Sequence, residues 1–441
     1  MKLEEEILQR ITPDEEHRRF VDRVVSDLMK KVKKEISRLN LLLEARLVGS
    51  VAKDTYLPNP DIDIFIMFPP SVSRKELETI GLDIGRRVIG GEEHYAEHPY
   101  IHGKYKGLDV DLVPCYNIEN PSNIKSAVDR TPFHTDFIRK NLADNQKPEV
   151  RLLKQFMKGI GVYGAEAKIQ GFSGYLVELL VLKYGDFLST VKSASEWKRG
   201  ETLWLERRGD IKFNDPLIFY DPVDLTRNVA SPVSIDSFSR FIYACSSYLR
   251  EKDERFFFPK KKEDWKIKKI REFFKKRETA VVIVRFNRPN IVDDDLYPQI
   301  RKTEESAVNL LESHDFIVIN RASHVDRHVL IAFELQSSKL PIAKRHEGPP
   351  MWIDHSKRFL EKWKGGKGLS EPFIDQGKLV VIAKREYVDA AELLRQRIKT
   401  ASLGKDFKGM RFDVVSGKEV FRKDYRRIMT DLLDKRMPWE I

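Results

Sequence analysis

The chain has 441 residues, a hydrophobic fraction of 41% and a formal net charge of +11 at pH 7. That hydrophobic fraction is enough for packed cores and argues against long-range disorder, and no apolar run approaches the ~20 residues that span a bilayer. The two cysteines, Cys115 and Cys245, have no close partner in sequence. We therefore expect no disulfide framework, no cysteine-based zinc site, no membrane association and a reducing, cytoplasmic location.

Positive charge is concentrated in one short stretch. Between Arg250 and Arg277 there are 13 Lys and Arg against 6 Asp and Glu. Such an excess attracts polyanions, because phosphate contacts release condensed counterions. A solvated, highly charged helix of a heat-adapted protein fits the same composition. Charge alone leaves both interpretations open.

The N-terminal part of the chain has the pattern of an α+β domain. Thr12 fits the N-cap of a long helix whose apolar positions recur every four residues. Strands are predicted at 45–48, 62–68 and 108–113, with a helix at 74–88. One helix followed by strands with inserted helices indicates an α+β domain over residues 1–145.

The hydrophobic period changes near Glu149. Helices are predicted at 150–160, 172–184 and 234–250, which gives a helical central domain over residues 146–255. The third domain, 256–441, is predicted to contain helices at 262–277, 298–312 and 389–398 and strands at 280–286, 316–320, 329–335 and 379–383. A sheet packed against helices is frequent among RNA-binding proteins. Pro349-Pro350 is predicted to be a loop.

A pair of carboxylates lies at the start of the second predicted strand. Residues two apart on a strand point to one face, so Asp61 and Asp63 project together. Adjacent carboxylates repel each other unless a cation neutralises them, and hard oxygen ligands suit Mg²⁺. A bare Asp-x-Asp is more often a solvated strand edge, so the surrounding residues must decide between these interpretations.

Val48-Gly49-Ser50 precedes the pair, with ten residues between Ser50 and Asp61. Gly49 lets the backbone approach a phosphate, Ser50 offers a hydroxyl donor, and residues 51–56 are predicted to begin a helix whose N-terminus attracts anions. Such a turn would hold a triphosphate beside metal ions. This hydrophobe-Gly-Ser turn followed by Asp-hydrophobe-Asp resembles the polymerase-β-like nucleotidyltransferase superfamily.

That chemistry requires a third carboxylate on a neighbouring strand. Asp109 and Asp111 share one face of the predicted strand at 108–113, and spacing does not distinguish them. The superfamily resemblance favours Asp111, which precedes a hydrophobic pair and Pro114-Cys115-Tyr116.

Longer blocks distributed over all three predicted domains resemble the archaeal, class I CCA-adding enzymes. The blocks are AEHPYIHG (96–103), VDLVPCY (110–116), NIKSAVDRTPFH (123–134), EVRLLKQFMKGIGVYGAE (149–166), GFSGYLVELL (171–180), DPVDLTRNVA (221–230) and NIVDDDLYPQ (290–299). The resemblance implies an α+β fold with a polymerase-β-like nucleotidyltransferase head, a helical central domain and a C-terminal α/β RNA-binding body and tail.

The resemblance also implies an activity and its partners. The enzyme would add and repair the 3′-terminal CCA of tRNA without a template, from CTP and ATP, using two Mg²⁺ ions and releasing pyrophosphate. It would bind the acceptor stem and upper half of tRNA, and a homodimer is one open alternative for its assembly. Two other functions stay open: a poly(A)- or oligoadenylate-forming polymerase, and a non-catalytic RNA-binding protein.

The family's site residues carry over position by position. Asp61, Asp63 and Asp111 would be the catalytic, metal-binding carboxylates. The residues implied to bind nucleotide are Gly49, Ser50, Lys53, His134, Lys154, Tyr163 and Arg227, the last in the block associated with base recognition. Lys53 departs from the arginine of the family pattern, so its phosphate contact would be a point charge and not a fork.

Several of these residues have ordinary structural alternatives. His134 fits a capping or packed histidine, Lys154 a solvated position of an amphipathic helix, and Tyr163 the end of a helix. Arg227 fits an ion pair with Asp221 or Asp224.

Two further clusters favour structural roles. His94, His98 and His102 recur every four residues, but Pro99 and Gly103 interrupt a helix there and no pattern completes a zinc site. Asp293-Asp294-Asp295 precedes a predicted helix, where negative charge favours the helix dipole.

Overall fold

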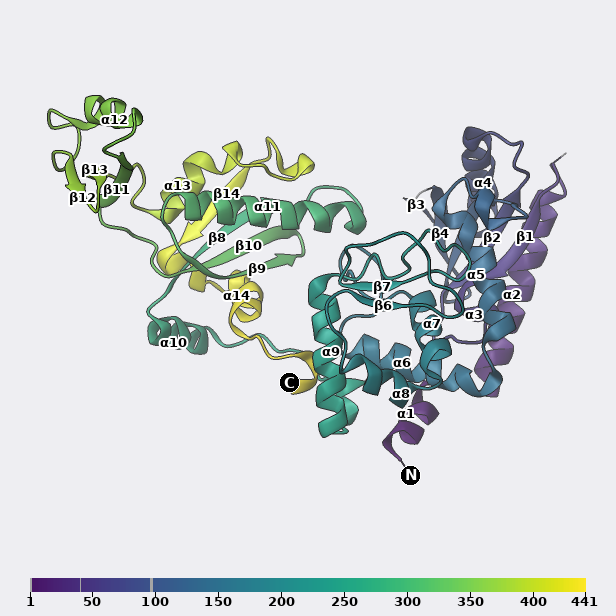
Figure 1. Ribbon diagram of the computed structural model, residues 1–441. Helices are drawn as coiled ribbons and strands as arrows, with labels where there is room; N and C mark the ends of the chain where they lie inside the picture. Colours follow the sequence, from purple (N-terminus) through teal and green to yellow (C-terminus); the bar gives the residue numbers. More distant parts are fainter. Residues whose placement is uncertain (1, 40, 96–97) are drawn as a thin grey trace. The chain divides into compact units, whose positions relative to one another are not determined.

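The computed structural model describes residues 2–39, 41–95 and 98–441 (Figure 1). These residues divide into two compact units, one within Met1–Lys261 and Arg436–Ile441 and the other formed by Lys262–Lys435. The predicted boundary between a head and a central domain therefore falls inside the first unit. No helix in the described ranges is both long and apolar enough to cross a membrane.

A mixed sheet forms the centre of the N-terminal head. Five strands of the described residues pair in the order β1-β2-β5-β4-β3. Only β2 and β5 run parallel; β1 pairs antiparallel with β2, and β4 with both β5 and β3. The strands are β1 (Glu44–Val48), β2 (Ile62–Phe68), β3 (Glu92–Tyr95), β4 (Pro99–Tyr105) and β5 (Leu108–Tyr116).

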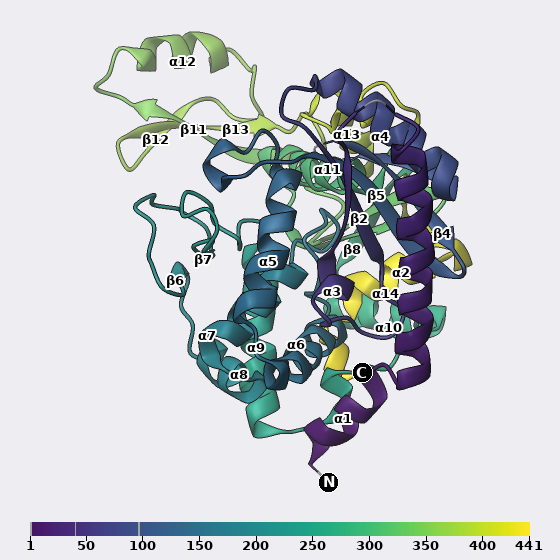
Figure 2. The same cartoon turned by 90° about the vertical axis from the view of Figure 1, so that its right-hand side faces the viewer.

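The two faces of this sheet carry different residues because side chains alternate along each strand. Ile62, Ile64 and Leu112 point to one face and form a core with α2 (Glu15–Ile36) and α4 (Arg74–Ile89), which pack beside the sheet in Figure 2. The opposite face carries Asp63 and Asp111, followed by a smaller apolar cluster that includes Phe65 and Val113. The helices therefore cover one face and leave the acidic face to the rest of the first unit.

The predicted N-cap of the long helix was wrong. Thr12 caps the C-terminus of an earlier helix, α1 (Leu3–Ile11), and the long helix α2 begins at Glu15. The carboxylate of Asp14 accepts a hydrogen bond of 2.7 Å from the backbone N–H of His17. Asp is a strong N-cap, and its position two residues closer to the long helix decides the boundary.

Helices make up most of the remaining first unit. They are α5 (Thr131–Asn141), α6 (Lys147–Gly159), α7 (Gly174–Tyr184), α8 (Phe187–Ala194) and α9 (Ile235–Arg250), joined by a short parallel pair, β6 (Glu201–Leu203) and β7 (Leu217–Phe219). Their core is rich in aromatic residues. Phe156 on α6 is fully buried, and five aromatic ring centroids lie 5.5 to 6.4 Å from its own.

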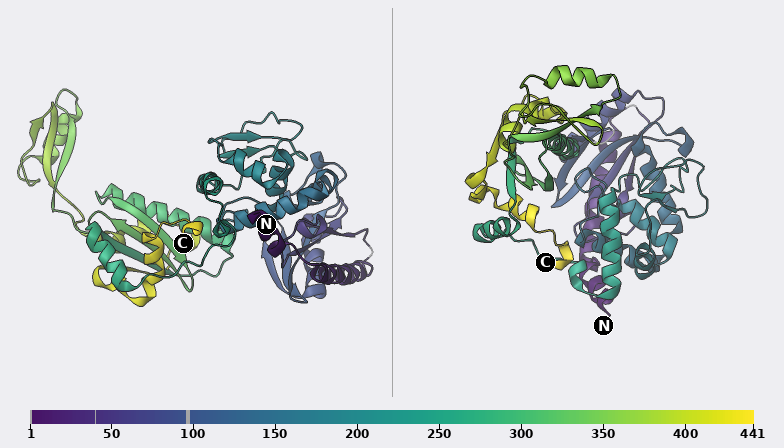
Figure 3. Two further views of the ribbon diagram at one scale, coloured as in Figure 1. Left: turned by 90° about the horizontal axis from the view of Figure 1, so that it is seen from below. Right: turned by 60° about the vertical axis from the view of Figure 1, so that its left-hand side comes forward.

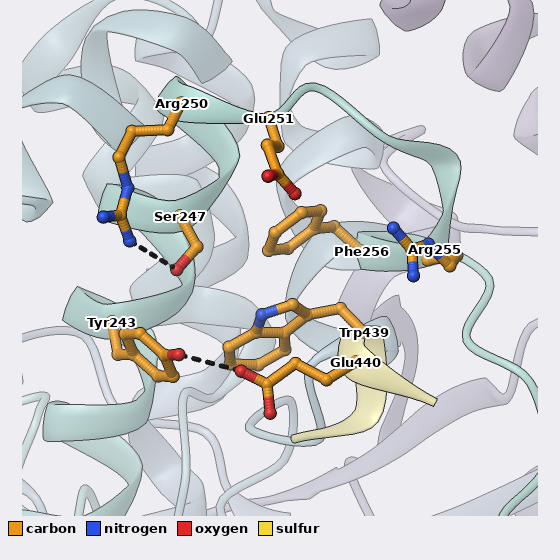
Figure 4. A pocket seen from close by; sticks show the side chains of 8 residues that line it. All are labelled: Tyr243, Ser247, Arg250, Glu251, Arg255, Phe256, Trp439 and Glu440. Atoms are coloured by element: carbon orange, nitrogen blue, oxygen red, sulfur yellow. Dashed lines mark hydrogen bonds between the residues drawn. The ribbon is translucent and has the colours of Figure 1, made fainter. Parts of the chain in front are cut away.

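The C-terminal residues 436–441 return to the first unit and pack on α9 (Figure 4). Trp439 stacks on Phe256 with 5.3 Å between ring centroids, and the Tyr243 hydroxyl donates a 2.8 Å hydrogen bond to Glu440. These residues line a cavity of about 480 Å³ together with Arg250 and Arg255. None of the residues lining it is among the sequence-predicted site residues.

The second unit is built on a four-stranded sheet of the described residues, in the order β14-β8-β10-β9. Alternate residues of β8 and β10 face two different cores, one with α11 and α13 and the other with α10 and α14. The elements are α10 (Ile267–Arg277), β8 (Ala280–Asn287), α11 (Asp293–Ser313), β9 (Val318–Val325), β10 (His328–Leu335), α13 (Ala390–Arg397), β14 (Phe412–Ser416) and α14 (Arg426–Leu433).

A smaller sheet lies within the same unit. Its strands are β11 (Ala343–Pro350), β12 (Phe373–Asp375) and β13 (Lys378–Lys384), and α12 (His355–Trp363) packs on β11 and β13, in light green in Figure 3. The predicted loop at Pro349-Pro350 was therefore wrong, because both prolines end β11. This strand lies at an edge of its sheet, where a missing N–H is tolerated.

Three predicted boundaries in the second unit also shift. The basic helix begins at Ile267 and not at Lys262. The helix predicted at 298–312 begins at Asp293, so the three aspartates lie in its first turn, where they complement the helix dipole. The strand predicted at 316–320 covers Val318–Val325.

We expect Phe156→Ala to destabilise the protein by about 3–5 kcal/mol, because the truncation leaves a cavity among five packed rings. Chemical denaturation measured by circular dichroism would show the change. Leu42→Ala is the control, since Leu42 is 89% exposed and its truncation opens no cavity. Equal effects of the two substitutions would contradict this account of the core.

Candidate active site

The parallel pairing of β2 and β5 brings two carboxylates together. In the register of this pair, Asp63 lies directly opposite Asp111, and both belong to the face that α2 and α4 leave uncovered. Asp61 is one residue before β2 and is exposed. Asp109 is also on β5, but it pairs with Lys104 at 3.1 Å. The geometry therefore distinguishes Asp111 from Asp109, which spacing in the sequence did not.

The turn after β1 is held against the same carboxylates. Val48, the last residue of β1, pairs with Asp63, and the chain then turns at Gly49 with a φ of +73°. A Cβ at Gly49 would lie 2.0 Å from Oδ2 of Asp63, so only glycine fits. The helix predicted at 51–56 was wrong: α3 spans Gly49–Ala52 and contains Ser50. The turn thus places the backbone of Gly49 against Asp63.

Burial and mutual repulsion raise the pKa of all three carboxyl groups. Burial, with the charges of Asp111 and Asp61, raises the pKa of Asp63 to about 7. Although Asp61 is exposed as a residue, partial burial of its carboxyl group raises its pKa, together with the charges of Asp111 and Asp109. Burial raises the pKa of Asp111 too, although a hydrogen bond with His102 partly opposes it. Clustered carboxylates of this kind are stabilised in their charged form by a nearby cation.

His102 is a neighbour of the carboxylates that the sequence did not reveal as part of the site. It lies opposite Asp111 in the β4–β5 register, and its Nδ1 is 2.7 Å from Oδ1 of Asp111. The ring of His94 stacks on that of His102 at 4.8 Å. His98 is buried elsewhere, with Nδ1 3.5 Å from Glu78. Strand alternation, which places His102 and Asp111 on one face, is the signal that could have found it.

The AEHPYIHG block that contains two of these histidines begins at Ala96 and Glu97, which lie outside the described residues. Within the described ranges, no three carboxylate, imidazole or thiol groups, the three aspartates included, are close enough to hold a metal ion by themselves. Mg²⁺ needs only one or two carboxylates and takes its other ligands from water and phosphates. The oxygen ligands present fit such an ion better than zinc, which favours a tetrahedral set that usually includes histidine nitrogen or cysteine sulfur.

Two predicted phosphate-binding lysines meet at one buried carboxylate. Lys53 follows α3 and Lys154 lies on α6, and both are more than nine-tenths buried. Nζ of Lys53 is 2.5 Å from Oε2 of Glu178 on α7, and Nζ of Lys154 is 3.4 Å from Oε1. Lys154 is therefore not the solvated helix position that was its structural alternative.

Glu178 and its partner Thr55 were missed by the sequence analysis. The hydroxyl of Thr55 donates a 2.6 Å hydrogen bond to Oε1 of Glu178 and accepts one of 3.1 Å from Lys154. A glutamate in the apolar helix GYLVELLVLKY was the available signal, because charged residues are rarely buried without partners.

A second buried carboxylate binds two more of the predicted residues, His134 and Arg227. Asp221 is fully buried and accepts hydrogen bonds from Nε2 of His134 (2.8 Å), Nη1 of Arg227 (3.0 Å) and the hydroxyl of Tyr175 (3.1 Å). The rings of His134 and Tyr175 stack at 3.9 Å. Of the two ion pairs considered for Arg227, the one with Asp221 forms, whereas Asp224 pairs with Arg130 at 3.1 Å.

In this second cluster, burial and hydrogen bonding have opposing effects on the pKa of His134 and on that of Asp221. Burial lowers the pKa of His134, against the opposing effect of Asp221. Burial also acts to raise the pKa of Asp221, but hydrogen bonding with His134 and the charges of His134 and Arg227 outweigh it and lower the pKa. Asp221 is therefore ionised at neutral pH and fixes the direction of both partners.

Tyr163 lies close to Lys154, and the charges of Glu178 and Asp61 act on its hydroxyl. A Cβ added at Gly174 would lie 3.1 Å from the hydroxyl of Tyr163 and 3.9 Å from Nζ of Lys154, so both groups border Gly174. Burial and the charges of Glu178 and Asp61 raise the pKa of Tyr163, so its hydroxyl is neutral. Instead of only closing a helix, Tyr163 lies in the electrostatic environment of both the lysines and the carboxylates.

Three family models match consecutive parts of the chain. They describe a nucleotidyltransferase domain over residues 29–134, a second domain of tRNA nucleotidyltransferase over residues 148–258, and a C-terminal domain of CCA-adding enzyme over residues 277–417. Among solved structures, a cytoplasmic RNA terminal U-transferase overlaps with 57% of this chain and 93% of its own, with a TM-score of 0.43 and 15% identity.

Curated relatives match over nearly the whole chain. A CCA-adding enzyme of Methanosarcina barkeri is 42% identical over 407 residues, which cover 90% of this chain and 89% of that protein. The CCA-adding enzyme of Archaeoglobus fulgidus is 36% identical over 434 residues, covering 96% of this chain and 97% of that protein. The chain therefore belongs to the family of archaeal CCA-adding enzymes, with a nucleotidyltransferase domain in its N-terminal part.

Proposed function

We propose that this protein adds and repairs the 3′-terminal CCA of tRNA in the cytoplasm, without a template and from CTP and ATP. The observation that carries the proposal is the position of Asp63 opposite Asp111 beside the Gly49 turn, in a chain of this family. A poly(A)-forming polymerase and a non-catalytic RNA-binding protein are not favoured, because the C-terminal match is to CCA-adding enzymes and the three carboxylates are intact.

Asp61, Asp63 and Asp111 would hold two Mg²⁺ ions. The raised pKa of each carboxyl group supports this assignment, since a bound cation would relieve their repulsion. Bound there, Mg²⁺ would lower the pKa of the RNA 3′-hydroxyl and stabilise the leaving oxygen.

The residues around the carboxylates would bind the triphosphate. The backbone at Gly49 and the hydroxyl of Ser50 would donate to phosphate oxygens, and Lys53 and Lys154 would supply positive charge. His134 and Tyr163 would contact the triphosphate or the sugar. Held in this way, the α-phosphorus accepts in-line attack: the bond from the RNA 3′-oxygen forms, the bond to the β-phosphate oxygen breaks, and pyrophosphate leaves without a protein nucleophile.

A single assay separates the candidate functions. The full-length protein is incubated with tRNA lacking its 3′ end, Mg²⁺ and each nucleoside triphosphate, and the product ends are sequenced. A CCA-adding enzyme adds C, C and A and then stops. Continued addition of A would indicate a poly(A)-type polymerase, and unchanged RNA would indicate a binding protein.

We expect Asp111→Asn to reduce nucleotide addition at least about a hundredfold while tRNA affinity stays nearly unchanged. Removal of a residue that hydrogen-bonds to a metal ligand lowers metal affinity or activity about 10–100-fold, and removal of the ligand itself lowers them at least as much. Asp109→Asn is the matched control, because it removes the same charge from the same strand face at the residue that pairs with Lys104. Equal losses in the two variants would remove Asp111 from the proposed metal site.

We expect CTP and ATP to be accepted, UTP and GTP to be rejected, and Arg227→Ala to weaken this discrimination by about 1–3 kcal/mol. Cytosine and adenine present a ring-nitrogen acceptor beside an amino group, whereas uracil and guanine present a ring N–H there. Arginine only donates hydrogen bonds, and Asp221 holds one of its donors. Incorporation of all four nucleotides is compared in wild type, Arg227→Ala and Arg227→Lys; unchanged selectivity in both variants would place base recognition elsewhere.

We propose that the basic residues of the second unit bind the sugar-phosphate backbone of the tRNA acceptor stem and upper half. On α10, Lys268, Lys275 and Lys276 are exposed. Changing all three to Gln should make the plot of log tRNA affinity against log salt concentration less steep. Its slope should fall in magnitude by about 0.7–0.9 for each lysine–phosphate ion pair that the substitutions remove. Lys30, Lys33 and Lys34 of α2, changed in the same way, remove equal charge and serve as the control. An unchanged slope in the α10 variant would assign these lysines to a solvated surface.

A further inference from the structure

Glu178 joins three segments of the first unit at one buried point. It is completely buried on α7, and its two carboxylate oxygens are shared among Lys53, Thr55 and Lys154. Lys154 also donates a 3.0 Å hydrogen bond to the backbone carbonyl of Thr55. The segment 53–55, which directly follows the Gly49–Ala52 turn, is thus bonded to both α6 and α7.

The charges of this group do not cancel. Two ammonium groups face one carboxylate, and Arg151 of α6 is a further buried cation nearby, itself paired with Asp54 at 2.6 Å. Burial lowers the pKa of Lys154 to about 8, and the charge of Glu178 opposes that shift. Burial acts to raise the pKa of Glu178, but Lys53 and Lys154 outweigh it and lower the pKa. The group therefore keeps an excess of positive charge in a buried place, which an anion would neutralise.

We propose that Glu178 is a positioning residue for nucleotide binding: it keeps the ammonium group of Lys154 charged and holds it and Lys53 in place for the triphosphate. This inference rests on the proposed function, in which both lysines contact phosphate. Glu178 itself carries the wrong charge to bind a phosphate, so it acts through the two lysines.

Removal of the carboxylate has a consequence that depends on pH. The groups that face Lys154 are Glu178 from α7, Lys53 after α3, Arg151 from its own helix, and the neutral hydroxyl of Tyr163. Without Glu178, the remaining charged neighbours are cations, and both lower the pKa of Lys154 further. A lysine loses its charge as pH rises through its pKa, so the variant would lose the Lys154 charge at a lower pH than the wild type.

The test measures binding of CTP and of ATP, each with Mg²⁺, to full-length wild type and Glu178→Gln by calorimetry at about pH 6 and about pH 7.5, both below the pKa of Lys154 in the wild type. We expect the variant to bind roughly tenfold or more weakly than wild type near the upper pH, where Lys154 of the wild type keeps the charge that strengthens its hydrogen bond to phosphate and Lys154 of the variant has lost it. Near the lower pH the two proteins should differ much less. The same ratio of affinities at both pH values would overturn the proposal, because loss of structure alone has no such dependence.

Glu334→Gln is the matched control. Glu334 is also a fully buried carboxylate, paired with Arg277 at 2.9 Å and Thr279 at 2.8 Å, but it lies in the second unit. Its substitution should lower stability without changing nucleotide affinity at either pH. A shift of nucleotide affinity in this variant that equals that of Glu178→Gln would also overturn the proposal.

Two further outcomes keep the inference separate from the proposed function. If Glu178→Gln does not fold, Glu178→Asp serves instead, because it retains the charge and withdraws it by one methylene. This variant should bind nucleotide more weakly than wild type by the same factor at both pH values. Wild-type affinity in this variant would overturn the positioning role.

If the wild type itself binds neither CTP nor ATP, the proposed function fails, and the role of Glu178 fails with it.

Discussion

The parallel pairing of β2 and β5 is the constraint on which the candidate site depends. It places Asp63 opposite Asp111, and because side chains alternate along a strand, it also sends the neighbouring isoleucines and leucines into the core under α2 and α4. A slip of one residue would bury the carboxylates and expose that core, so the hydrophobic effect fixes the acidic face. The turn then accepts only glycine at position 49, because Asp63 occupies the space that a side chain there would need.

Two buried carboxylates outside the sheet hold the basic side chains of the candidate site. Glu178 binds two lysines, and Asp221 binds His134 and Arg227. In both clusters, the carboxylate fixes the direction of several donors. The rigid carboxylates and the basic groups that they hold lie on different elements of one compact unit, which brings negative and positive parts of the candidate site together only when the unit is folded.

Local patterns predicted the part of the site that depends on strand geometry. The period of two placed Asp63 and Asp111 on strand faces, and the boundaries of β2 were predicted without error, although Asp61 lies one residue before this strand. The same reasoning found Asp221 as a partner of Arg227, but it did not reach Glu178 as the partner of Lys53, His102 as the partner of Asp111 or Asp221 as the partner of His134. Those contacts join residues from 9 to 125 positions apart. The error at Thr12 arose because Asp14, a stronger cap, starts the long helix two residues later. The error at 51–56 arose because the short helix already begins at Gly49 and ends at Ala52.

The balance of charge across the first unit follows from these contacts. Burial raises the pKa of each of the three acidic residues, and repulsion by neighbouring carboxylates adds to the shift, while the lysines share a single carboxylate between them. A direct pairing of the two sets would satisfy both, yet Lys53 and Lys154 are bonded to Glu178 instead. Glu178 is therefore the counter-ion of both lysines in this structure, while the charge of Lys53 also acts on Asp63 and partly opposes the rise of its pKa. A triphosphate with its metal ions has the complementary distribution, with cations to meet the aspartates and phosphate oxygens to meet the lysines, and such a ligand is stabilised by both sets of charges at once.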